Sequence, residues 1–181
     1  GTGTLSAPGE RGEIVVRGPG ITSGYEDNAT ANAAAFTAGW FRTGDEGYLD
    51  DQGYLFITGR LKEQINKGGE KISPLEIDAA LLEDPDLCQA VAFAVDHPTL
   101  GEDVAAAVVP RAGSRTTASR IRERLAQRLA LYKIPSRIVI VDELPKSATG
   151  KVQRIGLART LAELDRRQRG DEFDAPQTRT E

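Results

Sequence analysis

The chain of 181 residues has one cysteine, one histidine and no methionine, and aromatic residues make up only 6% of it. A single cysteine excludes an intrachain disulfide, and so few thiol and imidazole groups argue against a metal site built from them. No apolar run reaches the roughly 20 residues that span a bilayer, and no charged-then-apolar leader opens the sequence. We therefore expect a cytoplasmic protein without a membrane partner, and no residue is assigned to a metal.

Strong charge of either sign is also missing. The formal net charge is −4 and the sequence pI is near 5.2. A mildly acidic chain lacks the positive field that attracts nucleic acid, so we expect no nucleic-acid partner. Its length suits one ordinary domain, or a small domain with a piece of another.

The lone cysteine and histidine both have structural interpretations. Cys88 lies in an apolar run, where burial as a small hydrophobe is expected. His97 stands in Asp96-His97-Pro98, which is typical of a turn. Neither residue has a second thiol or imidazole beside it in the sequence, so we expect no catalytic or metal-binding role for them.

Residues 1–58 read as β-rich. Residues 13–17 predict a strand, residues 28–36 a short helix with Asn28 as its cap, and residues 48–57 two strands joined by a tight polar turn. These elements have too few apolar residues to close a core. We expect this part to be the end of a larger domain.

The pattern from residue 62 onward predicts a small mixed domain, giving an α+β fold with a short sheet and flanking helices. Residues 62–72 predict a hairpin. Ser73, Pro74 and Glu76 then predict a helix start with a capping box. The remaining expected elements are strands at 91–95, 104–109 and 138–141, and helices at 117–130 and 155–167.

These patterns give an expected domain organisation. The ranges are a β-rich end of a large domain at 1–59, a hinge at 60–62, a small lid domain at 63–168, and a linker at 169–181. The linker is expected because its polar and charged residues offer almost nothing that could pack.

Two segments place chemistry on candidate turns. In residues 41–45 (FRTGD), Asp45 follows a Gly turn, and a carboxylate fixed there could accept both hydroxyls of a ribose; a plain Gly-Asp turn is the alternative. Gly68 and Gly69 allow an extended ligand arm to approach the backbone closely, although a hairpin turn that needs positive φ explains them equally well.

The third segment, residues 145–154 (PKSATGKVQR), holds Lys151 at the end of a Gly-containing loop. A lysine there is a movable point charge that could meet a carboxylate or phosphate held elsewhere. The alternative is an ordinary solvated loop between a strand and a helix.

Taken together, these segments resemble the adenylate-forming superfamily of acyl-CoA synthetases, peptide-synthetase adenylation domains and luciferases. The resemblance covers about residues 12–164 and includes residues 12–14 (GEI), 24–25 (GY), 41–45, 59–62 (GRLK), 68–74 (GGEKISP) and 145–151. Within the superfamily, residues 66–74 look most like acyl-CoA synthetases, and residues 61–77 are similar to the oxalate–CoA ligase branch.

The resemblance implies an enzyme that uses ATP with Mg²⁺ to activate a carboxylic acid as an acyl-adenylate. It then transfers the acyl group to the thiol of CoA. Asp45, Arg60 and Tyr48 would bind the nucleotide, and Lys151 would be the catalytic lysine of adenylation.

The resemblance also implies domain alternation. The small domain would turn about Lys62 and bring Lys67, Gly68 and Gly69 to the pantetheine arm. The phosphate-binding loop and the acid pocket of the family are not found in this sequence, so we expect the missing large N-terminal domain to supply them and this chain alone to be inactive.

Two alternatives remain open. Residues 174–181 resemble the linker that leads into carrier domains, which would make the chain part of an adenylation domain of a modular polyketide or nonribosomal peptide synthetase. It would then load a carrier-protein phosphopantetheine, possibly one fused downstream, in place of CoA. A non-catalytic binding module with a borrowed fold is the other alternative.

Overall fold

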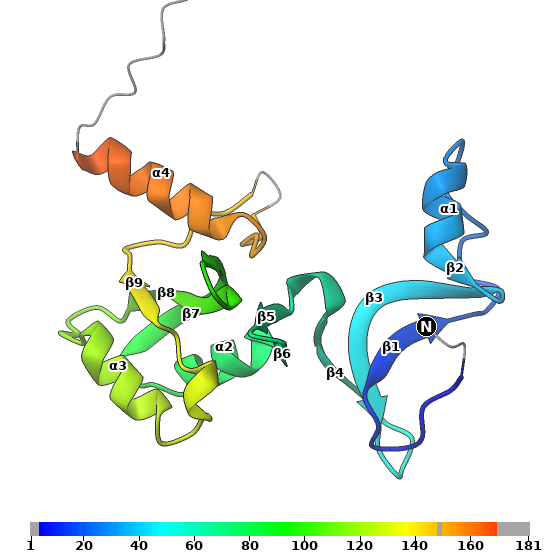
Figure 1. Ribbon diagram of the computed structural model, residues 1–181, viewed down its shortest axis with the longest axis horizontal. Helices are drawn as coiled ribbons and strands as arrows, with labels where there is room; N and C mark the ends of the chain where they lie inside the picture. The colour runs from blue at the N-terminus through cyan, green and yellow to red at the C-terminus, as the bar shows by residue number, and fades with distance from the viewer. Residues whose placement is uncertain (1–3, 148–149, 170–181) are drawn as a thin grey trace, which may run out of the picture.

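A computed structural model of the chain describes residues 4–147 and 150–169, which form two separate β-sheets (Figure 1). The first sheet is antiparallel, with the order β1-β3-β2 and with β4 paired to β3. Its elements are β1 (Gly12–Val16), α1 (Ala29–Ala35), β2 (Phe36–Thr37), β3 (Trp40–Leu49) and β4 (Leu55–Arg60). Asn28 caps α1 as expected, since its side chain accepts a hydrogen bond from the Ala31 amide at 2.9 Å.

Asp45 lies inside β3 and not on a turn, so that part of the sequence prediction is wrong. In the pairing of β1 with β3, Glu13 lies opposite Glu46 and Val15 opposite Arg42, and the register shifts between these two pairs. Such an irregularity keeps the strand continuous while re-aiming its side chains. The positive φ of 74° at Gly44, beside Asp45, is a conformation that glycine adopts without strain.

The second sheet follows the order β6-β5-β8-β7, and β9 pairs in parallel with β8. Its strands are β5 (Ile65–Lys67), β6 (Glu70–Ile72), β7 (Leu87–His97), β8 (Gly101–Pro110) and β9 (Arg137–Ile140). Three helices accompany it, α2 (Pro74–Leu82), α3 (Ala118–Leu125) and α4 (Leu157–Arg169), with short 3₁₀ helices η1 (Leu61–Glu63) and η2 (Leu131–Lys133). The mixed α+β fold and the 65–72 hairpin are thereby confirmed.

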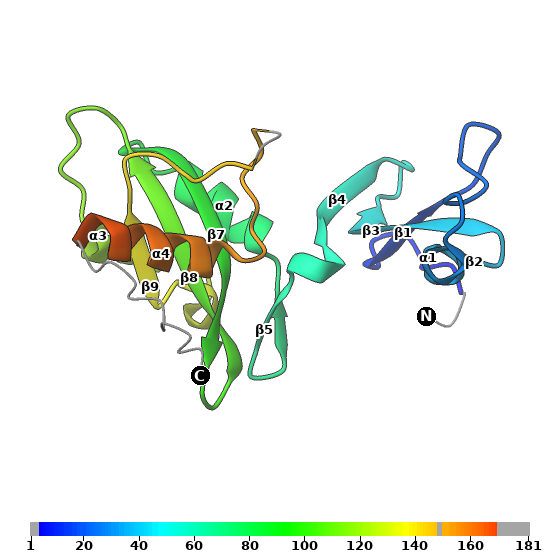
Figure 2. The ribbon, with the colours of Figure 1, turned by 90° about the horizontal axis from the view of Figure 1, so that it is seen from above.

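The core lies on both faces of this second sheet (Figures 1 and 2). Ala92 and Ala106 face α2 and α3, while their neighbours Phe93 and Ala105 belong to a second cluster with Leu157 of α4. The alternation follows from the two-residue period of a strand. Strands β7 and β8 are therefore apolar on both faces, which explains their continuous hydrophobic runs.

Three local predictions need correction. Ser73 occupies the cap position of α2, but its hydroxyl donates to the Thr58 carbonyl at 2.6 Å and caps nothing, and Glu76 binds Lys133. Pro74 does begin the helix. Cys88 is exposed, because the pairing of β7 with β8 shifts between Leu87 and Gln89 and breaks the alternation there.

The predicted helix at 117–130 is also shorter in the structure. Thr117 caps α3 by accepting from the Arg120 amide, and the helix ends at Leu125. The residues that follow form turns up to η2. The apolar residues at four-residue spacing therefore continue beyond the end of the helix.

The first sheet contributes nothing to the buried hydrophobic core of the described residues, all of which lies at or beyond Ile65. Large apolar side chains of β4 and its neighbourhood are instead exposed: Leu49, Tyr54, Leu55, Phe56 and Ile57. As the sequence predicted, residues 4–58 close no hydrophobic core of their own in this structure. No helix in the described part of the chain has the length and apolar character that crossing a bilayer requires.

Candidate functional site

Two of the predicted nucleotide-binding residues are brought side by side. Asp45 and Arg60 are register partners on β3 and β4, and Arg60 Nε lies 2.9 Å from Asp45 Oδ1. The Arg60 side chain is 64% exposed and that of Asp45 24% exposed, so both can still reach a ligand. The pair presents a carboxylate that accepts hydroxyl protons next to a guanidinium that binds phosphate.

The third predicted nucleotide-binding residue, Tyr48, lies further along β3. Its ring stacks on Phe56 of β4, with ring centroids 5.2 Å apart. Gly47 is needed beside it, because a Cβ at this position would lie 2.4 Å from the Phe56 carbonyl and 2.9 Å from Ile14 Cδ1. A glycine at this position thus lets β3 lie close to both β1 and β4 beside Tyr48.

Lys151 is exposed in the connection between β9 and α4. The ends of its loop are joined by an isolated bridge between Lys146 and Val152, and the Lys151 carbonyl accepts from the Ser147 amide at 2.8 Å. Among the described residues, no side chain forms an ion pair with the Lys151 ammonium, whereas Lys146 is paired with Glu143 at 2.7 Å. The loop base is therefore fixed and the Lys151 charge is available to a ligand.

The Gly68-Gly69 turn joins β5 to β6 with φ values of 60° and 94°, so the hairpin interpretation holds. The Gly68 amide donates to the Leu100 carbonyl at 2.9 Å, which ties this turn to the β7–β8 turn. Gly69 has open space where a Cβ would stand. The backbone at Gly69 is thus accessible to an extended ligand.

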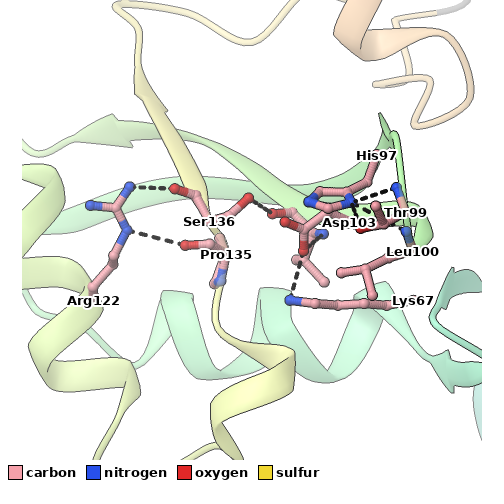
Figure 3. Close-up of polar contacts among 9 residues, drawn as sticks. Lys67, His97, Thr99, Leu100, Asp103, Arg122, Pro135 and Ser136 are labelled. Carbon is pink, nitrogen blue, oxygen red and sulfur yellow. Dashed lines mark hydrogen bonds and ion pairs between the residues drawn. The ribbon is translucent and has the colours of Figure 1, made fainter.

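Lys67, directly before this turn, binds Asp103 of β8 at 2.7 Å (Figure 3). Both side chains are largely buried, with 18% and 10% exposed. Burial raises the pKa of Asp103, but hydrogen bonds from Lys67, Ser136 and the Val104 amide outweigh it and lower the pKa below its ordinary value. Lys67 therefore stabilises the turn end of the hairpin in this structure, and its predicted contact with a pantetheine arm stays a prediction.

His97 closes the neighbouring turn (Figure 3). Its Nδ1 accepts from the amides of Thr99 and Leu100 at 3.3 and 3.2 Å. The ring is thus a structural element of the β7–β8 turn, as the sequence predicted. The same turn presents Leu100 to Gly68.

The predicted hinge residue, Lys62, is exposed in η1, between the last strand of the first sheet and the first strand of the second. The Arg60 and Gln64 positions on either side of η1 are extended or irregular backbone. The position fits a hinge, and the role of Lys62 stays a prediction.

Arg154 belongs to the segment that contains Lys151, but the sequence predicted no role for it. The sequence also predicted no functional role for Glu63 or Asp78. In the structure the Arg154 guanidinium binds Glu63 of η1 and Asp78 of α2, each at 2.9 Å. Burial raises the pKa of Asp78, and the Arg154 charge only partly opposes this. The available signal was the position of Arg154 three residues after Lys151, but no spacing rule predicts partners so far away in sequence.

The described residues contain no group of three or more His, Cys, Asp or Glu side chains that could hold a metal ion. No described residue is therefore assigned to Mg²⁺, and no step is assigned to the metal here. The residues just described instead offer a carboxylate–guanidinium pair, an available lysine and an open glycine turn.

This arrangement defines a class of protein. A small mixed domain with an exposed lysine loop is joined through a short connection to a β-rich unit, which carries the Asp45–Arg60 ion pair. Residues 76–151 match the AMP-binding enzyme C-terminal domain. The chain thus carries this domain, which confirms the resemblance to the adenylate-forming superfamily.

Relatives agree with that assignment. The chain is 50% identical over 152 residues to the oxalate–CoA ligase of Arabidopsis thaliana, covering 84% of this chain and 30% of the relative. It is 47% identical over 161 residues to that of Saccharomyces cerevisiae, covering 88% of this chain and 30% of the relative.

A solved structure of the Bacillus subtilis o-succinylbenzoate CoA synthetase, in complex with its acyl-adenylate intermediate, matches with a TM-score of 0.79 and 35% identity. The match covers 86% of this chain and 32% of that one. The chain spans about a third or less of the length of these proteins.

Proposed function

We propose that this chain is the C-terminal part of an ATP-dependent acid–CoA ligase, which activates a carboxylic acid as an acyl-adenylate and transfers it to the CoA thiol. The observation that carries the proposal is Lys151, an exposed cation without a counter-ion among the described residues, on a loop fixed at its base. It lies within the domain that matches the AMP-binding enzymes.

The chemistry needs such a cation. The acid's carboxylate and the α-phosphate of ATP repel each other, and their approach builds further negative charge on the phosphate. A positioned ammonium opposes this repulsion and stabilises the developing charge. Lys151 would bridge the carboxylate and the nucleotide, while Asp45 would accept hydrogen bonds from the ribose hydroxyls and Arg60 would lie nearby.

In the second step the thiol displaces AMP, so Lys151 has no further task at the carbonyl. Rotation about Lys62 would withdraw it and bring the open backbone of Gly68 and Gly69 to the pantetheine arm. The absence of any atom near a Cβ at Gly69 supports this role, since an extended arm needs such access.

The exposed apolar side chains of β4 support the presence of a large partner domain. Phe56 and Ile57 are 46% and 62% exposed, and an uncovered apolar strand of this kind marks a surface that another part of the protein covers. We propose that the phosphate-binding loop and the acid pocket belong to that domain, and that this chain alone does not catalyse adenylation.

The test uses the protein with its large domain. Oxalate is the first acid to try, because two relatives carry the name oxalate–CoA ligase. Acid-dependent pyrophosphate exchange measures adenylation, and thioester formation from a supplied acyl-adenylate measures the second step. Lys151→Ala should lower exchange by on the order of 100-fold or more while leaving thioester formation within about threefold.

Lys146→Ala is the matched control, since this lysine is in the same loop but is paired with Glu143. It should leave both steps near the wild-type rate. Equal loss of both steps in Lys151→Ala would refute the assigned role, and clear exchange by the isolated chain would refute the need for the large domain. Comparing thioester formation with CoA and with a phosphopantetheinylated carrier protein decides which thiol is the acceptor. If no acid supports pyrophosphate exchange, the result would favour a non-catalytic binding module.

A further inference from the structure

Arg154 links the end of the lysine loop to three other elements. Its Nε binds Glu63 Oε2 in η1 at 2.9 Å, its Nη2 binds Asp78 Oδ2 in α2 at 2.9 Å, and its Nη1 donates to the Ala92 carbonyl in β7 at 2.5 Å. The Arg154 side chain is only 12% exposed. Every arm of the guanidinium is therefore used, in a geometry that only a planar fork provides.

The inner part of this network closes on itself. Asp78 Oδ1 accepts from the Ala92 amide at 2.6 Å, while Asp78 Oδ2 and the Ala92 carbonyl both accept from Arg154. This ring of contacts already supplies Arg154 with a counter-ion inside the small domain. Glu63 is thus an additional partner, and it is the one that lies next to the predicted hinge residue Lys62.

The distance along the chain makes this link relevant to Lys151. Arg154 is the third residue after Lys151, so their Cα atoms lie within about 11 Å of each other whatever the backbone does. The bridge between Lys146 and Val152 restricts the segment further. Fixing Arg154 therefore fixes the point from which Lys151 extends.

We infer that Arg154 is a positioning residue, which locks the lysine loop to η1 through Glu63, so that Lys151 moves together with the hinge side of the small domain. The inference rests on the proposed function, in which Lys151 serves adenylation only. A loosened loop would then impair adenylation, because a misplacement of about 1 Å at a reacting group can cost up to 100-fold. The second step would not need the loop.

Two variants separate positioning from simple stability. Glu63→Gln keeps the shape and hydrogen-bonding capacity but removes the charge that holds the hinge side, and Arg154→Lys keeps a charge but cannot bridge three partners. Asp86→Asn is the matched control, because it neutralises an acid paired with Arg124 at 2.8 Å elsewhere in the same domain.

In the protein with its large domain, Glu63→Gln and Arg154→Lys should lower kcat of pyrophosphate exchange by about tenfold or more. Thioester formation from a supplied acyl-adenylate should stay within about twofold, and KM for ATP should not change, because the Asp45–Arg60 pair lies in the other sheet. Asp86→Asn should leave all three quantities unchanged. Equal loss of both steps in Glu63→Gln, or wild-type rates in both variants, would overturn the inference.

A second measurement does not depend on catalysis. Amide hydrogen exchange of a peptide covering residues 150–156 should be faster in Glu63→Gln than in the wild-type chain, and unchanged in Asp86→Asn. Unchanged exchange in Glu63→Gln would overturn the inference even if the enzyme is active. If amide hydrogen exchange is faster in Glu63→Gln but the protein shows no adenylation activity, the positioning role of Arg154 would stand and the proposed function would be rejected.

Discussion

Replacing Lys67 by methionine should destabilise the chain mainly by leaving the Asp103 carboxylate buried without its counter-ion. The two groups are 2.7 Å apart and have only 18% and 10% of their side chains exposed. Breaking a buried pair from one side costs about 3–5 kcal/mol. We expect about 3 kcal/mol, the lower end, because Asp103 Oδ1 keeps the hydrogen bond from the Val104 amide at 2.7 Å.

The pKa of Asp103 determines how the stability difference between variant and wild type should change with pH. In the wild type the pKa of Asp103 is lowered from 3.8, so its contribution to stability is present above that pH and is lost as the pH falls through the folded-state pKa. Without Lys67, the strongest interaction that lowers the pKa of Asp103 is lost, so this pKa should rise. Acid then protonates Asp103 and relieves the unpaired charge, so the stability difference between variant and wild type should shrink from pH 7 to pH 4.

Urea unfolding followed by circular dichroism at both pH values measures the difference. Lys71→Met is the matched control, since Lys71 is an exposed lysine of the same hairpin, and it should stay within about 0.5 kcal/mol of wild type. A difference for Lys67→Met below about 1 kcal/mol at pH 7, or one that is the same at pH 4, would refute the reasoning.

Two further substitutions address each sheet separately. Gly47→Ala should destabilise the first sheet by about 1–3 kcal/mol because its Cβ would lie 2.4 Å from the Phe56 carbonyl, and the fluorescence of Trp40, the sole tryptophan, reports this sheet. An unshifted Trp40 transition would contradict the close approach. Ile121→Ala should cost about 2–5 kcal/mol in the second sheet's core, where Ile121 is 1% exposed, as measured by circular dichroism. A loss below about 1 kcal/mol would show that α3 packs loosely there.

The sequence predicted elements whose signals are local. Asn28 caps α1, Pro74 begins α2, and the apolar runs at 91–95 and 104–109 lie in β7 and β8, because caps, ring geometry and strand periodicity act over a few residues. Lys151 and its loop were identified in the same way, by a motif read along the chain.

Several of the failures come from contacts with distant residues. Ser73 has an ordinary capping pattern but donates to Thr58, because strand β4 lies beside the start of α2. Cys88 is exposed because a register shift, set by the pairing with β8, interrupts the alternation that would have buried it. The partners of Arg154 lie 62 to 91 residues away, and no local pattern predicts them.

The same contacts bear on how the two sheets can move. Ser73 Oγ binds the Thr58 carbonyl at 2.6 Å, and Gln64 Nε2 binds Glu46 Oε1 at 2.9 Å, so each contact joins the second unit to the first. Hydrogen bonds of these kinds contribute about 1 kcal/mol each, or up to about 3 where a charge takes part. Contacts of this strength can be broken by a ligand that binds another orientation of the two units better.

The Arg154 network limits where such a rotation can occur. Breaking its buried ion pairs would cost more than breaking the two contacts between the units, so Glu63 should move together with the small domain. Arg60 is held in the first sheet by its pairing with Asp45. Only Leu61 and Lys62 lie between these two fixed points, so we expect the rotation to occur at these two residues, the second of which is the hinge residue that the resemblance implies.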